Sequence, residues 1–377
     1  MQDAEFDCWL TFVRETSQTP DPALDLIYPH GLTWDSAFIV ARNGRKVAIV
    51  GRYDADTVRK LNAYDEVLIY DQGIAETLIA ALDAVNARTI GLNYSLSDSG
   101  SDGLSHGNFL RLQRWLTGRT LLSADDLLRQ VRETKSASEL ALIRTIIAAE
   151  QAVYAQMLAL PLRSMRETDI QARAHTMVEA AGLQIDGSRA GNPIVNAGPH
   201  SSIGHGLPNP EITADPGMIV HFDMWLRKDG YCADLQRCAY ILKPGETTAP
   251  VRVQHAWDAC WLALEAGRAM LKPGVQAFET DLVAREALVE CGYPEYMHAL
   301  GHHVGRNTHD GGSVLGPRWD RYGDRPFKAI APGSVFTLEL GVMVDGHGYI
   351  GIEEMVLVTE NGNEYLSEPQ RTLQLIA

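Results

Sequence analysis

The sequence lacks both a long hydrophobic run and an excess of positive charge. No stretch of the 377 residues approaches 18 consecutive apolar residues, so the sequence predicts no membrane-spanning helix. The 33 lysines and arginines are outnumbered by 48 aspartates and glutamates, and the net charge of −15 disfavours binding to nucleic acid or to anionic lipid. We therefore expect neither nucleic acid nor a membrane among the partners.

Cysteine is scarce as well. The chain has five cysteines, widely scattered and without a Cys-x-x-Cys pair, so the sequence predicts neither a disulfide framework nor a structural zinc knuckle. Residues 1–5 carry neither the basic segment nor the apolar core of a secretory signal peptide. Both observations favour a soluble, cytoplasmic protein whose thiols are reduced.

The composition that remains is globular, with 45% hydrophobic and 21% charged residues, and the length suggests about two domains. Within residues 1–130, strand-like runs alternate with helical patterns, and an Asn-Gly pair between residues 37–41 and 46–50 predicts a hairpin. This part has no Gly-rich phosphate loop and no cluster of acids or histidines. We expect it to serve as a scaffold, an oligomerisation domain or a substrate lid.

A long helical pattern marks the start of the second part. Ser136 and Glu139 have the spacing of a helix cap, and the pattern continues through Leu158. We therefore divide the chain into domains at residues 1–130 and 131–377. In the second domain, helical segments alternate with strand-like ones, and the sequence predicts strands at residues 218–222, 232–242, 335–340 and 353–358.

Two segments of the second domain share a spacing. In each, a Pro-Gly pair is followed six residues after the glycine by an acid, and a second acid follows 11 residues later in one copy and 14 in the other. The first copy holds Asp223 and Asp234, and the second holds Glu339 and Glu353. Such a repeat is typical of an internally duplicated fold with a pseudo-two-fold axis. Its four carboxylates would converge at the centre of one sheet.

Four carboxylates at close range repel one another unless a cation lies between them. Between the two copies lies the densest group of histidines, at residues 298, 302, 303 and 309. Oxygen donors with one imidazole suit a pair of divalent cations bridged by carboxylates. We expect His302 to join the acids and His303 to be a core residue, while strand alternation turns Glu354 away from Glu353.

This order of acids and histidines resembles the pita-bread metallopeptidases, the superfamily of creatinase, aminopeptidase P, prolidase and methionine aminopeptidase, over residues 135–377. The resemblance implies an α/β fold with a creatinase-like N-terminal domain and a C-terminal pita-bread domain that has internal pseudo-two-fold symmetry. It also implies two divalent metal ions, manganese before cobalt or zinc. The ligands it implies are Asp223, Asp234, His302, Glu339 and Glu353.

The same resemblance implies roles for other residues. Glu339 would be the general base, His298 and His309 would donate hydrogen bonds to the substrate, and His205 would line the substrate pocket. The implied activity is hydrolysis of Xaa-Pro bonds, foremost in dipeptides as in the bacterial Xaa-Pro dipeptidases, by a homodimer. The alternatives are an Xaa-Pro aminopeptidase acting on longer peptides, a creatinase-like hydrolase of a non-peptide amide, and a binding protein without catalysis.

Two positions depart from the family pattern. Met343 stands where aminopeptidase P and prolidases have a tyrosine, and Gly351 stands where they have an arginine. A dipeptidase needs a cation for the free carboxylate of its substrate, and arginine binds a carboxylate in bidentate fashion. The sequence does not identify which residue binds this carboxylate. The candidates are the arginines after the histidine cluster, namely Arg306, Arg318, Arg321 and Arg325.

Overall fold

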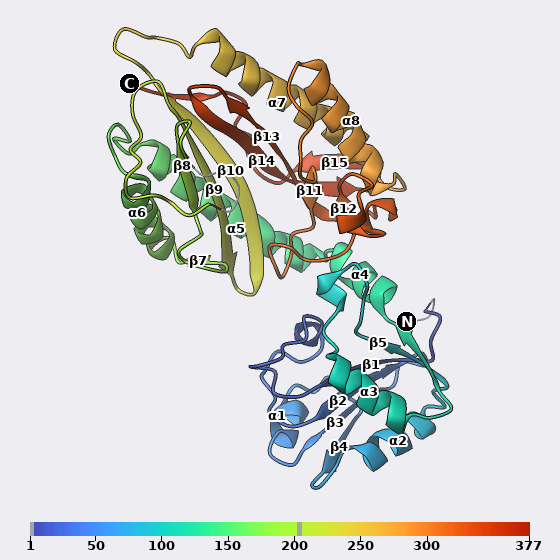
Figure 1. Cartoon of the computed structure of the whole chain (residues 1–377). Helices are drawn as coiled ribbons and strands as arrows, with labels where there is room; N and C mark the ends of the chain where they lie inside the picture. The colour runs from blue at the N-terminus through green and yellow to red at the C-terminus, as the bar shows by residue number, and fades with distance from the viewer. Residues whose placement is uncertain (1–3, 202–205) are drawn as a thin grey trace. The chain divides into compact units, whose positions relative to one another are not determined.

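The computed structural model describes residues 4–201 and 206–377, which form two compact units, Met1–Val131 and Arg132–Ala377 (Figure 1). The first unit is built on a six-stranded sheet with the order β4-β3-β2-β1-β5-β6. Its strands are β1 Cys8–Val13, β2 Ser36–Ala41, β3 Lys46–Gly51, β4 Glu66–Tyr70, β5 Thr89–Leu92 and β6 Thr120–Ser123. Its helices are α1 Ala55–Lys60, α2 Ala75–Ala84 and α3 His106–Trp115, and α4 Asp125–Glu133 follows them.

The hairpin predicted in the first unit is present. Strands β2 and β3 pair antiparallel, and Gly44 in the connecting turn has a φ of 89°, a left-handed conformation that favours glycine. Apolar side chains of the sheet are buried on both faces, for example Ile39 and Ile49 on one and Phe38 and Val50 on the other. The unit therefore has its own hydrophobic core.

The second unit contains an eight-stranded sheet whose main path runs β13-β14-β10-β9-β7. Its longer strands are β9 Ile219–Lys228, β10 Tyr231–Ile241, β13 Val335–Val344 and β14 Gly348–Thr359. Its shorter strands are β7 Gln184–Ile185, β8 Ile194–Ala197, β15 Gly362–Tyr365 and β16 Gln374–Ile376, and a separate pair consists of β11 Gly301–His302 and β12 Val314–Leu315. Its helices are α5 Ala137–Leu158, α6 Glu167–Ala180, α7 Val251–Met270 and α8 Ala277–Glu290.

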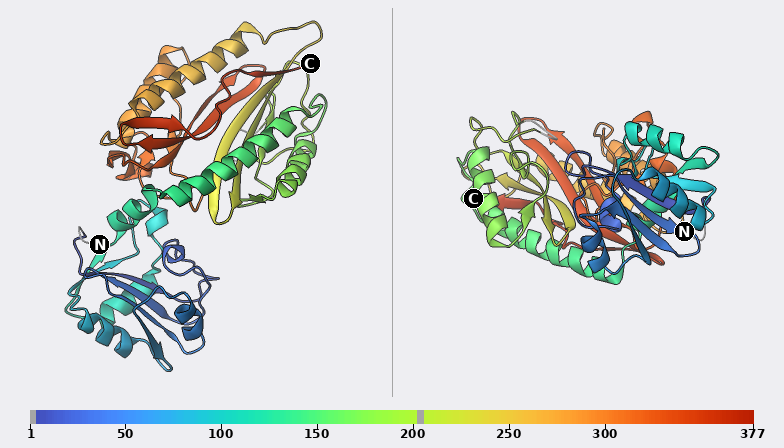
Figure 2. Two further views of the ribbon diagram at one scale, coloured as in Figure 1. Left: turned by 180° about the vertical axis from the view of Figure 1, so that it is seen from behind. Right: turned by 90° about the horizontal axis from the view of Figure 1, so that it is seen from below.

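Each of the two long hairpins of this sheet is covered by its own pair of helices (Figures 1 and 2). Phe222 and Met224 of β9 pack in one core with Tyr154 of α5. Leu338 of β13 packs in a second core with Trp257 of α7. The unit thus repeats one arrangement, a hairpin with two helices on its outer face, and the repeat agrees with the internal duplication expected from the acid spacing.

The central strands are longer than predicted. The sequence predicted strands that end at residues 222 and 340, but β9 continues to Lys228 and β13 to Val344. The reason is that an acid interrupts an apolar run without interrupting the backbone ladder. Asp229 and Gly230, with φ angles of 49° and 80°, form the tight two-residue turn between β9 and β10. Asp223 and Glu339 therefore lie inside strands rather than at strand ends.

Candidate metal centre

The strand registers place the predicted acids in one row across the sheet. Asp223 of β9 pairs with Gln236 of β10, Gln236 pairs with Glu353 of β14, and Glu353 pairs with Glu339 of β13. Directly paired residues point to the same face of a sheet, on strands about 4.8 Å apart. Asp234 precedes Gln236 by two residues and shares this face, whereas Phe222 and Met224 on the other face of β9 pack with α5.

The registers also account for the unequal spacing of the two acid pairs. The 14-residue separation makes Glu339 and Glu353 direct partners across the second hairpin. The 11-residue separation in the first hairpin places Asp234 opposite Trp225, two positions away from the partner of Asp223. The first acid pair is therefore diagonal and the second is direct, so the two halves of the site differ in shape.

His302 reaches the same face from the short strand β11. Its backbone N–H donates to Thr337 Oγ1 at 3.2 Å, while the N–H of Glu339 donates to the carbonyl oxygen of Leu300 at 2.7 Å, and these bonds hold β11 against β13. His302 Nε2 lies 3.8 Å from Asp234 Oδ2 and 3.6 Å from Glu339 Oε1. Each of Asp234, His302 and Glu353 offers a ligand atom within 4.8 Å of the others.

The electrostatics of this cluster suit cations. Burial, reinforced by the neighbouring acids, raises the pKa of Asp234 and Glu353 well above the usual range, and burial also raises the pKa of Asp223 and Glu339. Among the residues that the structure describes, no lysine or arginine forms an ion pair with any of the four. Buried Asp234 Oδ1 has no hydrogen-bond partner.

His302 completes a donor set that fits divalent metal ions. Burial lowers the pKa of His302 to about 3, so its imidazole is neutral at pH 7 and can act as a ligand. Carboxylate oxygens with one imidazole are the donors that such ions prefer. The cluster therefore fits the two cations expected from the sequence.

The two flanking histidines lie at the exposed side of the cluster. The ring of His309 meets the ring of His302 edge-on, with centroids 4.4 Å apart. His298 is exposed and lies against the ring of Tyr296 at 5.6 Å. Burial raises the pKa of Tyr296, and the nearby charges of Tyr349 and Glu339 contribute to this rise, so Tyr296 lies between His298 and the acids.

The other two histidines differ from these. His303 is buried, as expected for a core residue, and its Nε2 lies 2.9 Å from Ser313 Oγ and 3.3 Å from Glu133 Oε1. These contacts belong to the interior beneath the segment that carries His309. His205, predicted to line the substrate pocket, lies outside the described residues.

Glu354 faces the opposite side of the sheet from Glu353, as strand alternation predicted. It is fully buried rather than at the surface, where it forms an ion pair with Arg237 at 3.2 Å and accepts a hydrogen bond from Ser367 Oγ at 2.6 Å. Glu354 therefore stabilises the packing of β10 against β14 instead of joining the cluster.

Of the four arginines that follow the histidine cluster, one acts electrostatically on His302. Arg306, Arg318 and Arg321 lie over aromatic rings, those of Tyr231, Phe278 and Trp319 respectively. Arg325 Nε instead donates to the carbonyl oxygen of Gly312 at 2.6 Å, and its positive charge contributes to the lowered pKa of His302. Arg325 therefore differs from the other three arginines, because its charge acts on His302 and its guanidinium does not lie over an aromatic ring in the described contacts.

Three polar residues at the cluster were not identified from the sequence. His221 and Gln236 are hydrogen-bonded to each other on the face that carries the acids. Tyr349 lies directly opposite Met343 in the register, so the neighbouring strand supplies a tyrosine where β13 lacks one. The spacing in the sequence could have identified His221 and Gln236. His221 lies two residues before Asp223, and Gln236 lies two residues after Asp234, so period-two alternation places each on the same face of its strand as the neighbouring acid.

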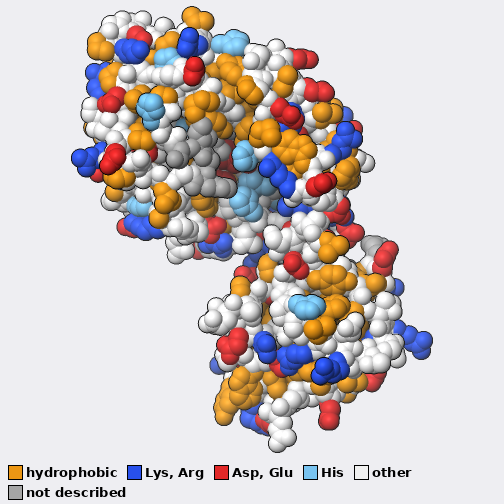
Figure 3. Space-filling model, in the orientation of Figure 1, with side chains coloured by type: hydrophobic (Ala, Val, Ile, Leu, Met, Phe, Trp, Pro, Cys, Tyr) orange, Lys and Arg blue, Asp and Glu red, His pale blue; other side chains and the backbone are white. Residues whose placement is uncertain are grey.

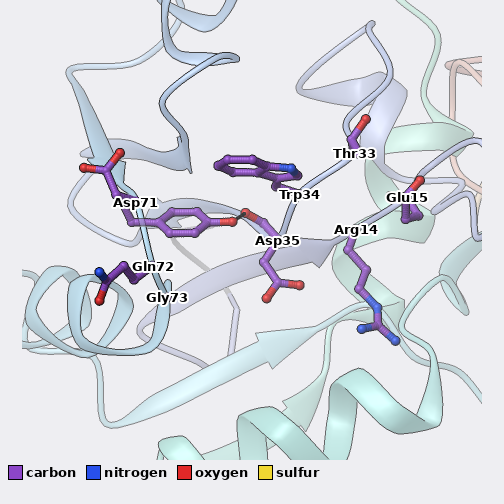
Figure 4. A pocket seen from close by; sticks show the side chains of 9 residues that line it. Arg14, Glu15, Thr33, Trp34, Asp35, Asp71, Gln72 and Gly73 are labelled. Carbon is purple, nitrogen blue, oxygen red and sulfur yellow. Dashed lines mark hydrogen bonds between the residues drawn. The ribbon is translucent and has the colours of Figure 1, made fainter.

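The first unit has a pocket of a different kind. A cavity of about 410 Å³ is walled by Trp34 and contains the carboxylates of Asp35 and Asp71 (Figure 4). Asp35 forms an ion pair with Arg111, and Asp71 forms one with Arg52 at 2.6 Å. These acids are already neutralised, and neither histidine nor cysteine lines the cavity. The candidate centre is therefore the cluster in the second unit.

Figure 3 shows the surroundings of this cluster from outside. Histidine side chains gather beside a hollow on one face of the second unit, and acidic atoms are visible inside it. None of the described helices is both long and apolar enough to cross a membrane.

Four acids on two repeated hairpins, joined by His302 from β11, define a metallopeptidase of the pita-bread type. The profile of metallopeptidase family M24 matches residues 141–360. This chain belongs to that family, and it is an enzyme of the metallopeptidase class.

Individual relatives agree with this assignment. The chain is 26% identical over 272 residues to the Xaa-Pro dipeptidase of Pyrococcus horikoshii, covering 72% of each chain. Its fold is similar to that of the X-Pro aminopeptidase from Thermotoga maritima, with a TM-score of 0.74, 23% identity, and coverage of 99% of this chain and 96% of the other. It is also similar to dipeptidase PepE from Mycobacterium ulcerans, with a TM-score of 0.77, 22% identity, and coverage of 98% and 93%. The likeness includes the N-terminal unit.

Proposed function

We propose that this protein hydrolyses Xaa-Pro bonds, with dipeptides as its preferred substrates and two divalent metal ions, manganese foremost, as its cofactor. The convergence of four acids, of which Asp234 and Glu353 are buried, and a neutral histidine, with no lysine or arginine paired to these acids among the described residues, carries the proposal. The relatives named Xaa-Pro dipeptidase support the substrate class.

In this proposal the predicted acids and histidine hold the two ions, namely Asp223, Asp234, His302, Glu339 and Glu353. When bound, the ions supply a hydroxide nucleophile at neutral pH and polarise the scissile carbonyl. Glu339 is the general base and holds the transferred proton at Oε1, because its Oε2 accepts a hydrogen bond from Gln236 Nε2 at 3.3 Å.

The two exposed histidines act on the substrate. His309 lies edge-on against His302 at the exposed side of the cluster, where a ring N–H can donate to the oxygen that gains negative charge in the transition state. His298, held against Tyr296, acts on the substrate from the side of Tyr349. His205 keeps its predicted place in the substrate pocket as part of this proposal.

Preference for dipeptides requires a cation near the site for the free carboxylate, and Arg325 is the candidate that the contacts favour. An Xaa-Pro aminopeptidase would not need this cation, so the two activities can be distinguished by the length of the substrate that is cleaved.

The five cysteines are all free, which supports a cytoplasmic location. A homodimer completes the proposal and can be checked by light scattering.

The test combines metal analysis with a substrate panel. The purified protein is assayed on an Xaa-Pro dipeptide, its C-terminal amide, an Xaa-Pro-Yaa tripeptide and creatine, before and after chelation. We expect hydrolysis of the free dipeptide above all, lost on chelation and restored by manganese. Equal cleavage of the tripeptide would favour the aminopeptidase, turnover of creatine without metal would favour the creatinase-like hydrolase, and bound metal without any turnover would favour a binding protein.

A further inference from the structure

Gln236 and His221 form a buried polar pair beside the acids. Their residues are only 6% and 4% exposed. His221 Nε2 lies 2.9 Å from Gln236 Oε1, so the imidazole N–H donates to the amide oxygen. This orientation leaves the amide nitrogen, Gln236 Nε2, to donate to Glu339 Oε2 at 3.3 Å. Gln236 is the one member of the row of paired residues that is not an acid.

The pair is held from behind by further buried contacts. His221 Nδ1 lies 3.2 Å from Asn196 Oδ1, and Asn196 Nδ2 donates to Ser201 Oγ at 3.1 Å. Ser201 Oγ in turn donates at 2.6 Å to Oε1 of Glu167, the first residue of α6, and that oxygen also accepts the N–H of Ala197 at 2.7 Å. Asn196, which lies directly behind His221, is therefore tied to α6 as well as to the sheet.

The space taken by this pair explains one departure from the family pattern. Gly341 and Gly351 are direct partners in the register of the second hairpin. A Cβ atom on Gly351 would lie 2.5 Å from both Gln236 Oε1 and His221 Nε2, and one on Gly341 would lie 2.2 Å from Tyr349 Oη. These approaches are too close for any side chain. An arginine at position 351 would therefore require the Gln236 and His221 side chains to move from these positions.

We propose that Gln236 is a positioning residue for Glu339, and that the Gln236–His221 pair occupies the space over Gly351, the position at which the family pattern has an arginine. Its amide holds Glu339 Oε2, which directs Oε1 toward His302 Nε2 at 3.6 Å. This inference rests on the proposed function, in which Glu339 is both a metal ligand and the general base.

The expected effect follows from the contacts that would be lost. Replacing Gln236 with leucine removes the donor to Glu339 and leaves the buried imidazole N–H of His221 without its acceptor. Removal of a hydrogen-bond partner behind a metal ligand typically costs about 10–100-fold in metal affinity or activity. We expect Gln236→Leu to bind manganese(II) about 10–100-fold more weakly than the parent chain.

The measurement is a calorimetric titration of the chelator-stripped full chain with manganese(II). Gln370→Leu is the matched control, because Gln370 Nε2 donates to the carbonyl oxygen of Cys238 at 2.7 Å and its Oε1 accepts the Cys238 N–H at 3.0 Å. Gln370 thus makes two hydrogen bonds to β10, as Gln236 makes two from it, but contacts none of the four acids. We expect the control to keep the parental affinity. A general effect of disturbing β10 would instead weaken both variants.

A second variant tests the link through His221. His221→Phe keeps a ring but removes the donor to Gln236, so it should lose part of the affinity lost in Gln236→Leu. Because both residues act through one contact to Glu339, the double variant should lose no more than Gln236→Leu alone. Parental affinity in Gln236→Leu, or additive losses in the double variant, would overturn the proposal.

This experiment also separates the positioning role from the proposed function. A parent chain that binds manganese(II) but hydrolyses no Xaa-Pro peptide would overturn the proposed function, while the affinity of Gln236→Leu would still decide the positioning role. A parent chain that binds no manganese(II) would overturn both. A Gln236→Leu variant that hydrolyses Xaa-Pro dipeptides and binds manganese(II) as the parent does would overturn the positioning role alone.

Discussion

Removal of metal should make the stability of this protein depend on pH in the neutral range. Burial raises the pKa of Asp223 to about 7 and that of Glu339 to about 8 in the metal-free chain. The unfolded chain loses these protons near pH 4, so the folded metal-free protein binds more protons, and its stability falls as pH rises through the two folded pKa values. Between pH 6.5 and 8.5 the two groups together lower the unfolding free energy by about 3 kcal/mol.

Two histidines partly offset this loss. Burial lowers the pKa of His302 to about 3 and that of His221 to about 4, while an unfolded histidine still binds about half a proton at pH 6.5, so the two together add about 1 kcal/mol of stability as pH rises to 8.5. For a unit of this size, the net loss of about 2 kcal/mol corresponds to a fall in Tm of about 4–8 °C. The metal-loaded protein should show little change, because the cations keep the carboxylates ionised throughout the interval.

The assay is differential scanning calorimetry of the chelated and the manganese-loaded protein at three pH values from 6.5 to 8.5. The double variant Asp223→Asn, Glu339→Gln is the control, since its amides do not titrate and its metal-free Tm should change less across the interval. The reasoning is refuted if the metal-free parent keeps the same Tm at both ends, or if the double variant shows an equal fall.

The remaining predictions concern individual side chains. Asp234→Asn and His302→Ala should each lower the metal content measured by plasma mass spectrometry, and parental content in both would contradict their assignment as ligands. His298→Ala and His309→Ala should lower kcat by about 10²-fold or more while both ions stay bound, since loss of one oxyanion donor has this magnitude, and loss of metal would make them ligands instead. Arg325→Ala should weaken hydrolysis of an Xaa-Pro dipeptide more than that of its C-terminal amide, and equal losses would exclude Arg325 as the partner of the substrate carboxylate.

Features that depend on neighbouring residues were predictable from the sequence. The capping box of Ser136 and Glu139 starts α5 as predicted, because its two hydrogen bonds span only one helical turn. The Asn-Gly turn between β2 and β3 is likewise a local preference of the backbone, and the structure confirms it. The strand ends beyond Asp223 and Glu339 were wrong, because each strand continues to pair with the next strand of its hairpin although its apolar pattern is interrupted.

The side chains that replace the two missing family residues were likewise not predicted from the sequence. Met343 and Gly351 indicated the loss of a tyrosine and an arginine near the cluster. The register then placed Tyr349 opposite Met343, and the space over Gly351 is filled by a hydrogen-bonded pair from another hairpin. Tyr349 belongs to the same hairpin as Met343, but the pair over Gly351 could not be read from local spacing, because it depends on the long-range pairing of β10 with β14.

The sequence by itself determined which residues could form a metal centre, because the order of acids and histidines and the matched spacing of two Pro-Gly segments are properties of the chain alone. Only the tertiary structure decided how these residues meet. The pairing of β10 with β14 joins the two hairpins and brings Asp234, His302 and Glu353 within reach of one another, and burial on that face shifts their pKa values. The register between β10 and β14 arises from pairing between segments more than 100 residues apart, so the geometry and the charge state of the complete centre follow from the fold rather than from any local pattern.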